Sequence, residues 1–240
     1  MVLRYQPSKK LQAFLIHLGL SLLVASLVLI LVLWLWYPAP LASATGVTHI
    51  ILMLISFDVI LGPLLTLLVY QEHKKSLKFD LSCIVVVQLL AFAYGLYTVA
   101  QPRPVWIVQT NQMFQLVAAN SVQTESLKNA QPPFQKNSWT QPRWVATNDQ
   151  NALQQGILDP AFYPEFYITL ESARVRIQQK QQPLDRLFMF NEHTQVEHIL
   201  AQYPNATAWM PLRTTGLGLV VLLDQQQNVV ATVDLRPWQE

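Results

Sequence analysis

Long apolar segments alternate with short polar ones over residues 1–100, and the two kinds of residue are mixed more evenly after that. Three apolar runs approach or exceed the length of a membrane-spanning helix: Phe14 to Tyr37, Thr48 to Tyr70 and Leu81 to Ala100. About 20 consecutive apolar residues, each rising 1.5 Å, cross the hydrocarbon core of a bilayer. The pattern therefore predicts a membrane protein in which residues 11–104 form a region of three transmembrane α-helices.

Charge is scarce and unevenly placed along the chain. Of its 240 residues, 52% are apolar and only 12% are charged, whereas about 25% are charged in soluble proteins. Between Lys10 and Glu72 the only formally charged side chain is Asp58. The net charge of +2 is too small to indicate nucleic-acid binding.

The basic residues near the three runs predict an orientation. They lie in two short segments: Arg4, Lys9 and Lys10, then Lys74, Lys75 and Lys78. The loop 38–47 carries no charge. Because short cytoplasmic loops are enriched in Lys and Arg, we expect residues 1–10 and the loop 71–80 to be cytoplasmic. Residues 105–240 would then lie outside the membrane, in the periplasm of a Gram-negative cell.

A cleaved signal peptide is the alternative interpretation of the first run. Ala42-Ser43-Ala44 is similar to a small-residue cleavage site. The run of Phe14 to Tyr37 is, however, longer than the 7–15 apolar residues, roughly, of a signal peptide. We therefore expect an uncleaved span, and the orientation of the later segments is the same in either case.

Residues 105–240 suffice for one domain with a modest core. Apolar, β-favouring runs predict a hairpin near each end of this region. Helices are expected between the hairpins, and the whole would be an α+β domain with antiparallel strands covered by helices on one side. The expected hairpin strands are 105–108 with 113–117 and 217–223 with 229–235, and the expected helices are 118–130, 164–180 and 184–202.

Asp58 is the most informative candidate for function. It lies in the second apolar run, four residues before Gly62-Pro63. An Asp at the centre of a membrane helix costs about 2.5–3.5 kcal/mol on insertion scales, so it faces a partner, a cavity or another helix rather than lipid. Two interpretations stay open, a contact with a partner's membrane helix and a hydrogen bond inside the three-helix bundle. Candidates for the second are Thr48, His49, Ser56, Thr66 and Gln88.

Side chains that support catalysis or metal binding are not found together. His193 and Glu197 have the i, i+4 spacing of two metal ligands on one helix face, but a third ligand is missing. Cys83 is the single cysteine and falls in the third apolar run, where a small packing residue is expected. We predict no enzyme activity, no metal site and no cofactor.

The apolar half of the chain resembles the type IV pilin accessory proteins of the TfpX/TfpZ family. The likeness covers nearly all of residues 11–104. The residues that carry it are 13–18 (AFLIHL), 36–41 (WYPAPL), 45–50 (TGVTHI), 58–66 (DVILGPLLT), 74–81 (KKSLKFDL), 94–99 (YGLYTV) and the pair Arg103-Pro104.

The resemblance implies a non-enzymatic, multi-pass protein of the bacterial inner membrane that helps the major pilin of a type IV pilus to assemble. The expected partners are the major pilin, the lipid bilayer and possible further parts of the pilus assembly machinery. Residues matching the family pattern are the candidates for partner contact or structure: Asp58, Gly62, Pro63, His49 and Arg103.

Two other classes of protein fit the sequence less well. A membrane sensor with a periplasmic ligand domain would need a cytoplasmic output module, but the predicted cytoplasmic segments have about ten residues each. A pilin-modifying transferase would need a cluster of acids or metal ligands near a membrane face.

Overall fold

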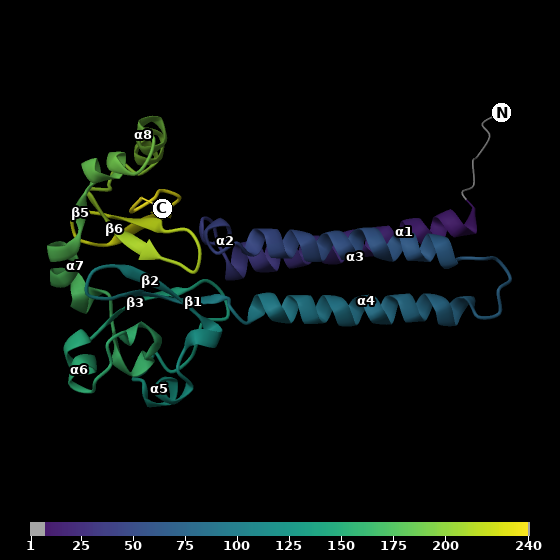
Figure 1. Cartoon of the computed structure of the whole chain (residues 1–240), viewed down its shortest axis with the longest axis horizontal. Coiled ribbons are helices and arrows are strands. Elements are labelled where there is room, and N and C mark those ends of the chain that lie inside the picture. The colour runs from purple at the N-terminus through teal and green to yellow at the C-terminus, as the bar shows by residue number, and fades with distance from the viewer. Residues whose placement is uncertain (1–7, 240) are drawn as a thin grey trace. The chain divides into compact units, whose positions relative to one another are not determined.

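The computed structural model describes residues 8–239, which form two compact units (Figure 1). The first unit holds the residues up to Trp34 together with Val47–Ala100, and the second holds Leu35–Gly46 together with the residues from Gln101 onward. Arg4, which contributes to the predicted orientation, lies outside the described residues.

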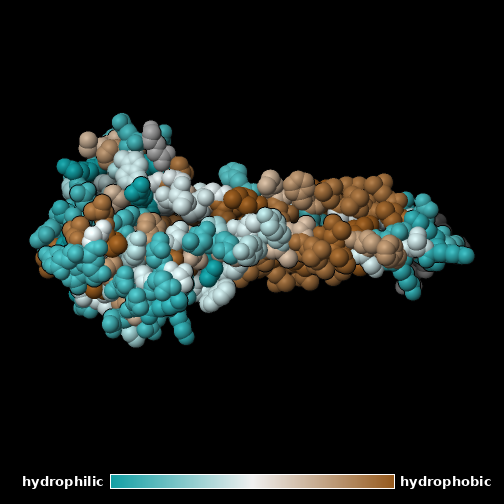
Figure 2. Space-filling view, turned by 60° about the horizontal axis from the view of Figure 1, so that its bottom comes forward, coloured by the Kyte–Doolittle hydropathy of each residue, from teal (hydrophilic) through white to brown (hydrophobic). Residues whose placement is uncertain are grey.

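Three long helices make up the first unit. They are α1 (Lys9–Ile30), α3 (Val47–Val69) and α4 (Leu77–Ala100), and α1 continues as a π-helical segment η1 (Leu31–Trp36). Each is long and apolar enough to cross a membrane, and Figure 2 shows most of their visible surface as hydrophobic. The predicted fold class, three apolar helices followed by an α+β domain, is confirmed.

The second unit is an α+β domain built on a curled, mixed sheet. Its strands are β1 (Pro104–Gln109), β2 (Phe114–Ala118), β3 (Arg143–Thr147), β4 (Tyr167–Ile168), β5 (Gln182–Pro183), β6 (Ala208–Arg213), β7 (Leu219–Leu223) and β8 (Val229–Val233). Its α-helices are α2 (Leu41–Ala44), α5 (Thr124–Asn129), α6 (Asp149–Gln154), α7 (Arg174–Lys180) and α8 (His193–Gln202). Short 3₁₀ turns are η2 (Ala119–Ser121), η3 (Pro160–Phe162), η4 (Pro164–Phe166), η5 (Glu171–Ala173) and η6 (Leu184–Met189).

The strand order is β4-β3-β1-β2-β6-β7-β8, and β5 pairs with β6 beside β2. Both expected hairpins are confirmed, because β1 pairs antiparallel with β2 and β7 antiparallel with β8. The pairings of β1 with β3 and of β2 with β6 are parallel. The sheet is therefore mixed, whereas the sequence analysis expected antiparallel strands throughout.

Helices pack on both faces of the sheet rather than on one. Along β7, Leu219, Val221 and Leu223 belong to one apolar cluster, while Val220 and Leu222 belong to another. The first cluster also contains Ile177 of α7, and the second contains Val196 of α8. Because successive side chains of a strand point to opposite faces, β7 is buried on both sides.

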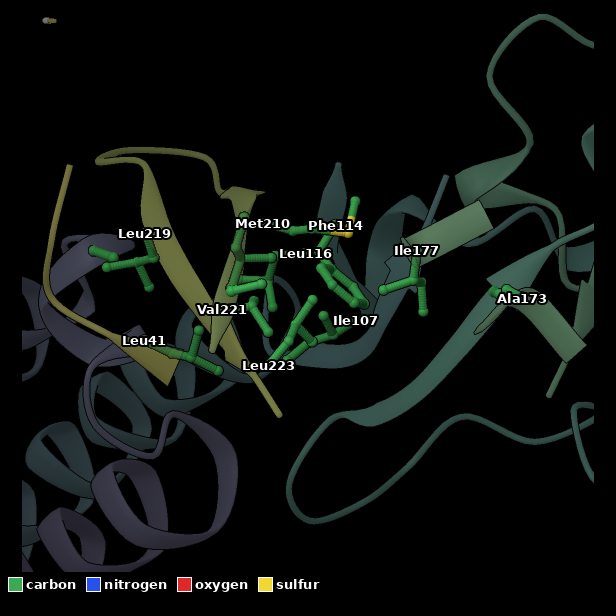
Figure 3. Packing of buried hydrophobic residues seen from close by; sticks show 14 residues of the cluster. Leu41, Ile107, Phe114, Leu116, Ala173, Ile177, Met210, Leu219, Val221 and Leu223 are labelled. Carbon is green, nitrogen blue, oxygen red and sulfur yellow. The ribbon is translucent and has the colours of Figure 1, made fainter. Parts of the chain in front are cut away.

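The loop before α3 is part of this domain. Leu41 and Ala44 are 3% and 2% exposed and belong to the same cluster as Leu219 and Val221. Figure 3 shows Leu41 close to the strand that carries Leu219. The backbone N–H of Leu217 donates to the carbonyl of Ala44 at 2.9 Å. A segment that precedes the sheet by about sixty residues thus completes its core.

The expected helix over 164–180 is wrong in its first half. Tyr167 and Ile168 form β4, which pairs with β3, and the Tyr167 hydroxyl donates to the carbonyl of Ala161 at 2.5 Å. Aromatic and β-branched residues favour a strand over a helix. The helical part begins as η5 at Glu171 and continues as α7.

The expected helices 184–202 and 118–130 are both interrupted. Asn191 donates to the carbonyls of Leu187 and Arg236, each at 2.9 Å, and accepts from the Arg236 N–H at 2.7 Å. Such side-chain bonds to the backbone compete with helix formation, so η6 ends before α8 begins. The stretch 118–130 forms η2 and then α5, separated by Val122 and Gln123.

Strands β3 and β6 were not predicted from the sequence. Pro142 lies directly before β3, and β6 itself contains Pro211. Proline lacks the backbone N–H that a strand needs for its neighbour. In the structure Pro211 lies between the part of β6 that pairs with β5 and the part that pairs with β2. Pro211 therefore lies where the neighbour of β6 changes from β5 to β2.

Candidate functional site

Asp58 lies on α3, the helix that packs against both of the others. Asp58, Gly62 and Thr66 are spaced by four residues, so they follow one face of α3. Gly62 and its neighbour Pro63 are buried, and Thr66 is 4% exposed. Gly62, Pro63 and Thr66 are therefore covered by the rest of the bundle, and Asp58 lies on the same face of α3.

Gly62 allows α4 to approach α3 closely at the level of Asp58. A Cβ atom at position 62 would overlap the amide end of Gln88 on α4. The reverse arrangement occurs at Gly95 of α4, where a Cβ atom would overlap the side chain of Leu54 on α3. The two helices thus interlock through a glycine on each side.

Gln88 connects α4 to Asp58. Its Nε2 donates to the backbone carbonyl of Asp58 at 3.2 Å and lies 3.5 Å from the carboxylate Oδ1. The second contact is at the limit of hydrogen-bond distance and is weak. The other amide atom, Gln88 Oε1, is buried and has no hydrogen-bond partner among residues 8–239. The side chains of Asp58 and Gln88 together therefore have more hydrogen-bond acceptors than donors.

Helix α1 makes a polar contact of its own with α3. His17 Nδ1 and Thr66 Oγ1 are 2.7 Å apart, and either atom can be the donor depending on the histidine tautomer. Each of the three helices therefore contributes a polar side chain to this layer of the bundle.

A groove of about 280 Å³ opens between α1 and α4, with Asp58 of α3 at its base. Its other lining residues are His17, Leu20, Ser21 and Val24 of α1, and Val85, Gln88, Leu89 and Phe92 of α4. We call this the Asp58 groove. Most of its lining residues are apolar, and the polar ones are His17, Ser21, Asp58 and Gln88. A mostly apolar lining with a few polar groups is typical of binding pockets.

Pro63 affects the backbone beside this groove. Proline has no N–H to donate and disturbs the helical bond to the residue four positions earlier, here Val59. The helix α3 nevertheless continues to Val69. A carbonyl without its helical donor is thus next to Asp58 in the chain, in a span where water is scarce.

The remaining sequence candidates lie apart from the groove. His49 is exposed and precedes Asp58 by nine residues on α3. Arg103 belongs to the second unit, where its guanidinium carbon lies 4.5 Å from the ring centroid of Trp139. Burial lowers the pKa of Arg103 and attraction to Tyr37 opposes that change. Because the pKa of an arginine lies far above neutral, its charge persists at neutral pH.

His17 and Trp139 were not identified as functional candidates from the sequence. The signal for His17 is a polar side chain inside the first apolar run, comparable to Asp58 in the second. Gln88 had been one of several possible partners for Asp58, and the structure selects it over Thr66, which bonds His17 instead.

Metal-binding side chains do not gather anywhere in the described part of the chain: residues 8–239 contain no group of three or more His, Cys, Asp or Glu placed to hold an ion. The ring of His193, the first residue of α8, lies 5.0 Å from that of Phe188.

These features define a class, a membrane protein whose three apolar helices precede an α+β domain. Residues 6–46 match the family model of the fimbrial assembly protein FimB. A fimbrial assembly protein of Dichelobacter nodosus, serogroups C1 and C2, is 33% identical over 117 residues, which cover 48% of this chain and 89% of that protein. The chain therefore belongs to the family of fimbrial assembly proteins.

Two further relatives match over almost the whole chain. The serogroup I fimbrial assembly protein of Dichelobacter nodosus is 26% identical over 238 residues, covering 92% of this chain and 93% of the relative. The serogroup E1 protein of the same organism is 25% identical over the same shares of both chains. No solved structure matches this chain.

Proposed function

We propose that this protein assists fimbrial assembly by holding the pilus subunit in the membrane before the subunit enters the filament. The relatives are named as fimbrial assembly proteins, which supports the general role. The finer proposal is that the subunit is the major pilin of a type IV pilus, in line with the resemblance to the TfpX/TfpZ family. The protein acts as a binding partner and carries out no chemical step.

The proposed location is the bacterial inner membrane, with the N-terminus in the cytoplasm and the α+β domain in the periplasm. Lys74, Lys75 and Lys78, with Lys9 and Lys10, support this orientation because short basic loops stay cytoplasmic. A pilin awaiting assembly has its apolar helix in the same bilayer and its head on the periplasmic side. The apolar helices of this chain would then lie at the depth of the pilin helix, and the α+β domain would lie on the same side of the membrane as the pilin head.

The Asp58 groove is the observation that carries the proposal. An apolar helix of the pilin would cover its apolar walls, and a hydrogen-bond donor on that helix would meet the base. Among residues 8–239, the Asp58 carboxylate receives only the weak contact from Gln88 at 3.5 Å, and Gln88 Oε1 has no partner. An unsatisfied polar atom in a membrane span is costly. An incoming donor would therefore gain more here than at a purely apolar surface.

Site-specific photo-crosslinking in piliated cells tests this binding site. A photoreactive amino acid at Leu89, which lines the groove, should crosslink to the pilin. The same group at Val87, two residues away on α4 and outside the groove, should not; both side chains are well exposed, at 60% and 65%. A second pair on α1 is Leu20 inside the groove and Ile16 outside it, at 58% and 65% exposure. Equal crosslinking from both members of each pair would reject the groove as the pilin site.

A further inference from the structure

Trp139 is the most exposed tryptophan of the α+β domain, at 73% exposure. It lies in the loop 130–142, between α5 and β3. The guanidinium carbon of Arg103 lies 4.5 Å from the centroid of its ring. Lys136, in the same loop, is exposed as well. The exposed Trp139 ring thus has Arg103 close to it in the fold and Lys136 three residues before it in the sequence.

The loop around Trp139 is held in a fixed conformation. Trp106 of β1 donates from its Nε1 to Asn137 Oδ1 at 3.0 Å. Arg143 stacks on the Trp106 ring at 4.1 Å and donates to the carbonyls of Pro133, at 3.2 Å, and Lys136. Because these bonds hold the loop just before Trp139, we interpret the exposure of its indole as part of the fold.

The same loop is bonded to the place where the chain leaves the apolar helices. Trp36 Nε1 donates to the backbone carbonyl of Trp139 at 3.1 Å. Trp36 is the last residue of the first apolar helix, and Arg103 follows the end of the third, Ala100, by three residues. If the helices span a bilayer, chain connectivity places Trp36 and Arg103 near its surface. Trp139 contacts both, so it lies at that level too.

We propose that Trp139 inserts its indole into the headgroup region of the lipid bilayer and fixes the α+β domain against the membrane surface. Tryptophan is enriched at this depth because its ring is apolar and its N–H needs a polar partner. Arg103 over the ring, and Lys136 three residues earlier in the loop, would place positive charge near the lipid phosphates. This inference needs the three helices to cross a membrane but does not depend on the proposed binding of pilin.

Depth-dependent fluorescence quenching in proteoliposomes tests the insertion. The full chain would carry Cys83→Ser and a single new cysteine, Thr140→Cys, labelled with an environment-sensitive fluorophore next to the intact Trp139. Nitroxide-bearing phospholipids should quench this label strongly. A matched label on Leu158→Cys, at a position 87% exposed in the same domain and outside this loop, should be quenched much less.

The variant Trp139→Ala in the Thr140→Cys background isolates the role of the ring. Because Trp139 is exposed, this change should leave the domain folded, which a melting curve checks. Lipid quenching at Thr140→Cys should fall toward the level seen at Leu158→Cys. Quenching that stays high would show that the loop meets lipid without Trp139 and would overturn the proposal. Equal quenching at both positions with Trp139 present would overturn it too, and would leave the exposed ring as a contact for a protein.

Discussion

Gln88 of α4 occupies the space into which a side chain at position 62 of α3 would project, so Gly62 determines how closely the two helices approach beside Asp58. Gln88 uses this closeness to donate to Asp58. The glycine and the carboxylate of the second span therefore belong to one arrangement, although they look like separate features in the sequence.

Replacing Gly62 with alanine should displace the Gln88 amide and weaken the α3–α4 contact. Overpacking costs about 1–3 kcal/mol, and we expect a loss of about 1 kcal/mol because the overlapping atoms are the flexible end of a glutamine. The free energy of unfolding in detergent micelles measures this loss. Gly19→Ala is the matched control, since a Cβ atom on Gly19 meets nothing within 4 Å.

The double variant Gly62→Ala with Gln88→Ala removes the overlap. It should recover most of the helix packing lost in Gly62→Ala, and the non-additivity of the two changes gives the coupling between the positions. If Gly62→Ala and Gly19→Ala changed stability equally, the interlocking of α3 and α4 at Gly62 would be disproved.

Elements set by local pattern could be predicted from the sequence. The three apolar helices follow from run length alone, and both hairpins follow from β-favouring runs around a polar turn. Asp58 stood out because of the energetic cost of its position, without knowledge of its neighbours. The break at Asn191 could not be predicted, because it depends on a bond to Arg236, distant in the chain.

Contacts between segments that are distant in the chain could not be predicted from the sequence. The parallel pairing of β1 with β3 requires a connection through α5, and no local pattern indicates which strands become neighbours. Leu41 belongs to the core of a sheet that begins at Pro104, but in the sequence it looks like part of a short loop between spans. The bond from His17 to Thr66 likewise joins different apolar runs.

Reporter fusions should reveal the orientation of the chain. Alkaline phosphatase is active only outside the cytoplasm, so a fusion after Gln101 should be active and one after Lys75 inactive. The reason is that the Lys and Arg residues before position 101 all lie in the N-terminal segment and the loop 71–80, while the loop 38–47 has none. The opposite pattern of activity would place the α+β domain in the cytoplasm and end its proposed role beside the pilin.

The substitution Leu41→Ala should destabilise the α+β domain even though Leu41 precedes α3 in the sequence. A buried Leu→Ala change costs about 2–5 kcal/mol, and Leu41 is 3% exposed within the sheet's core. We expect a loss near the middle of that range, measured as a lower melting temperature of the full chain by tryptophan fluorescence. Leu158→Ala, the same change at a site 87% exposed, should have little effect. Similar melting temperatures for both variants would contradict the docking of the loop.

Arg176 of α7 holds together three elements of the domain. Its guanidinium donates to the Thr147 carbonyl at 2.9 Å, to Asp149 Oδ2 at 3.1 Å, and to Gln109 Oε1 at 2.9 and 2.5 Å. Gln109 and Thr147 are fully buried. Removal of the arginine would take away both of its bonds to the buried Gln109 Oε1, and the loss of its donor costs a buried polar group about 1–3 kcal/mol.

Arg176→Leu should therefore lower the free energy of unfolding by about 2–3 kcal/mol, measured by denaturant titration of the full chain in detergent. Arg174→Leu serves as control, because Arg174 is more exposed, at 44% against 21%, and its contacts are to the surface residues Glu171 and Asn228. Surface changes of this kind are usually within 0.5 kcal/mol, roughly. A larger loss for Arg174→Leu than for Arg176→Leu would refute the central role of Arg176.

Asp58→Leu should keep the protein abundant and abolish its function. The substitution removes an insertion penalty of about 2.5–3.5 kcal/mol, so the amount in the membrane should not fall. Its cost inside the bundle is the bond with Gln88, and hydrogen bonds between membrane helices average about 0.6 kcal/mol. A folded chain without its groove acceptor is therefore expected, and surface pili measured against total pilin should drop.

Asp58→Asn then separates charge from hydrogen bonding at the base of the groove. Asparagine has a similar size and retains one oxygen acceptor, so partial piliation would mean that a donor on the pilin suffices. Complete loss with Asp58→Asn would mean that the negative charge itself is needed. Cys83→Ser, on α4 but outside the groove, is the control and should assemble pili normally. Normal piliation in cells that carry Asp58→Leu at normal abundance would show that Asp58 is not needed for partner binding. Asp58 would then be a packing residue between α3 and α4.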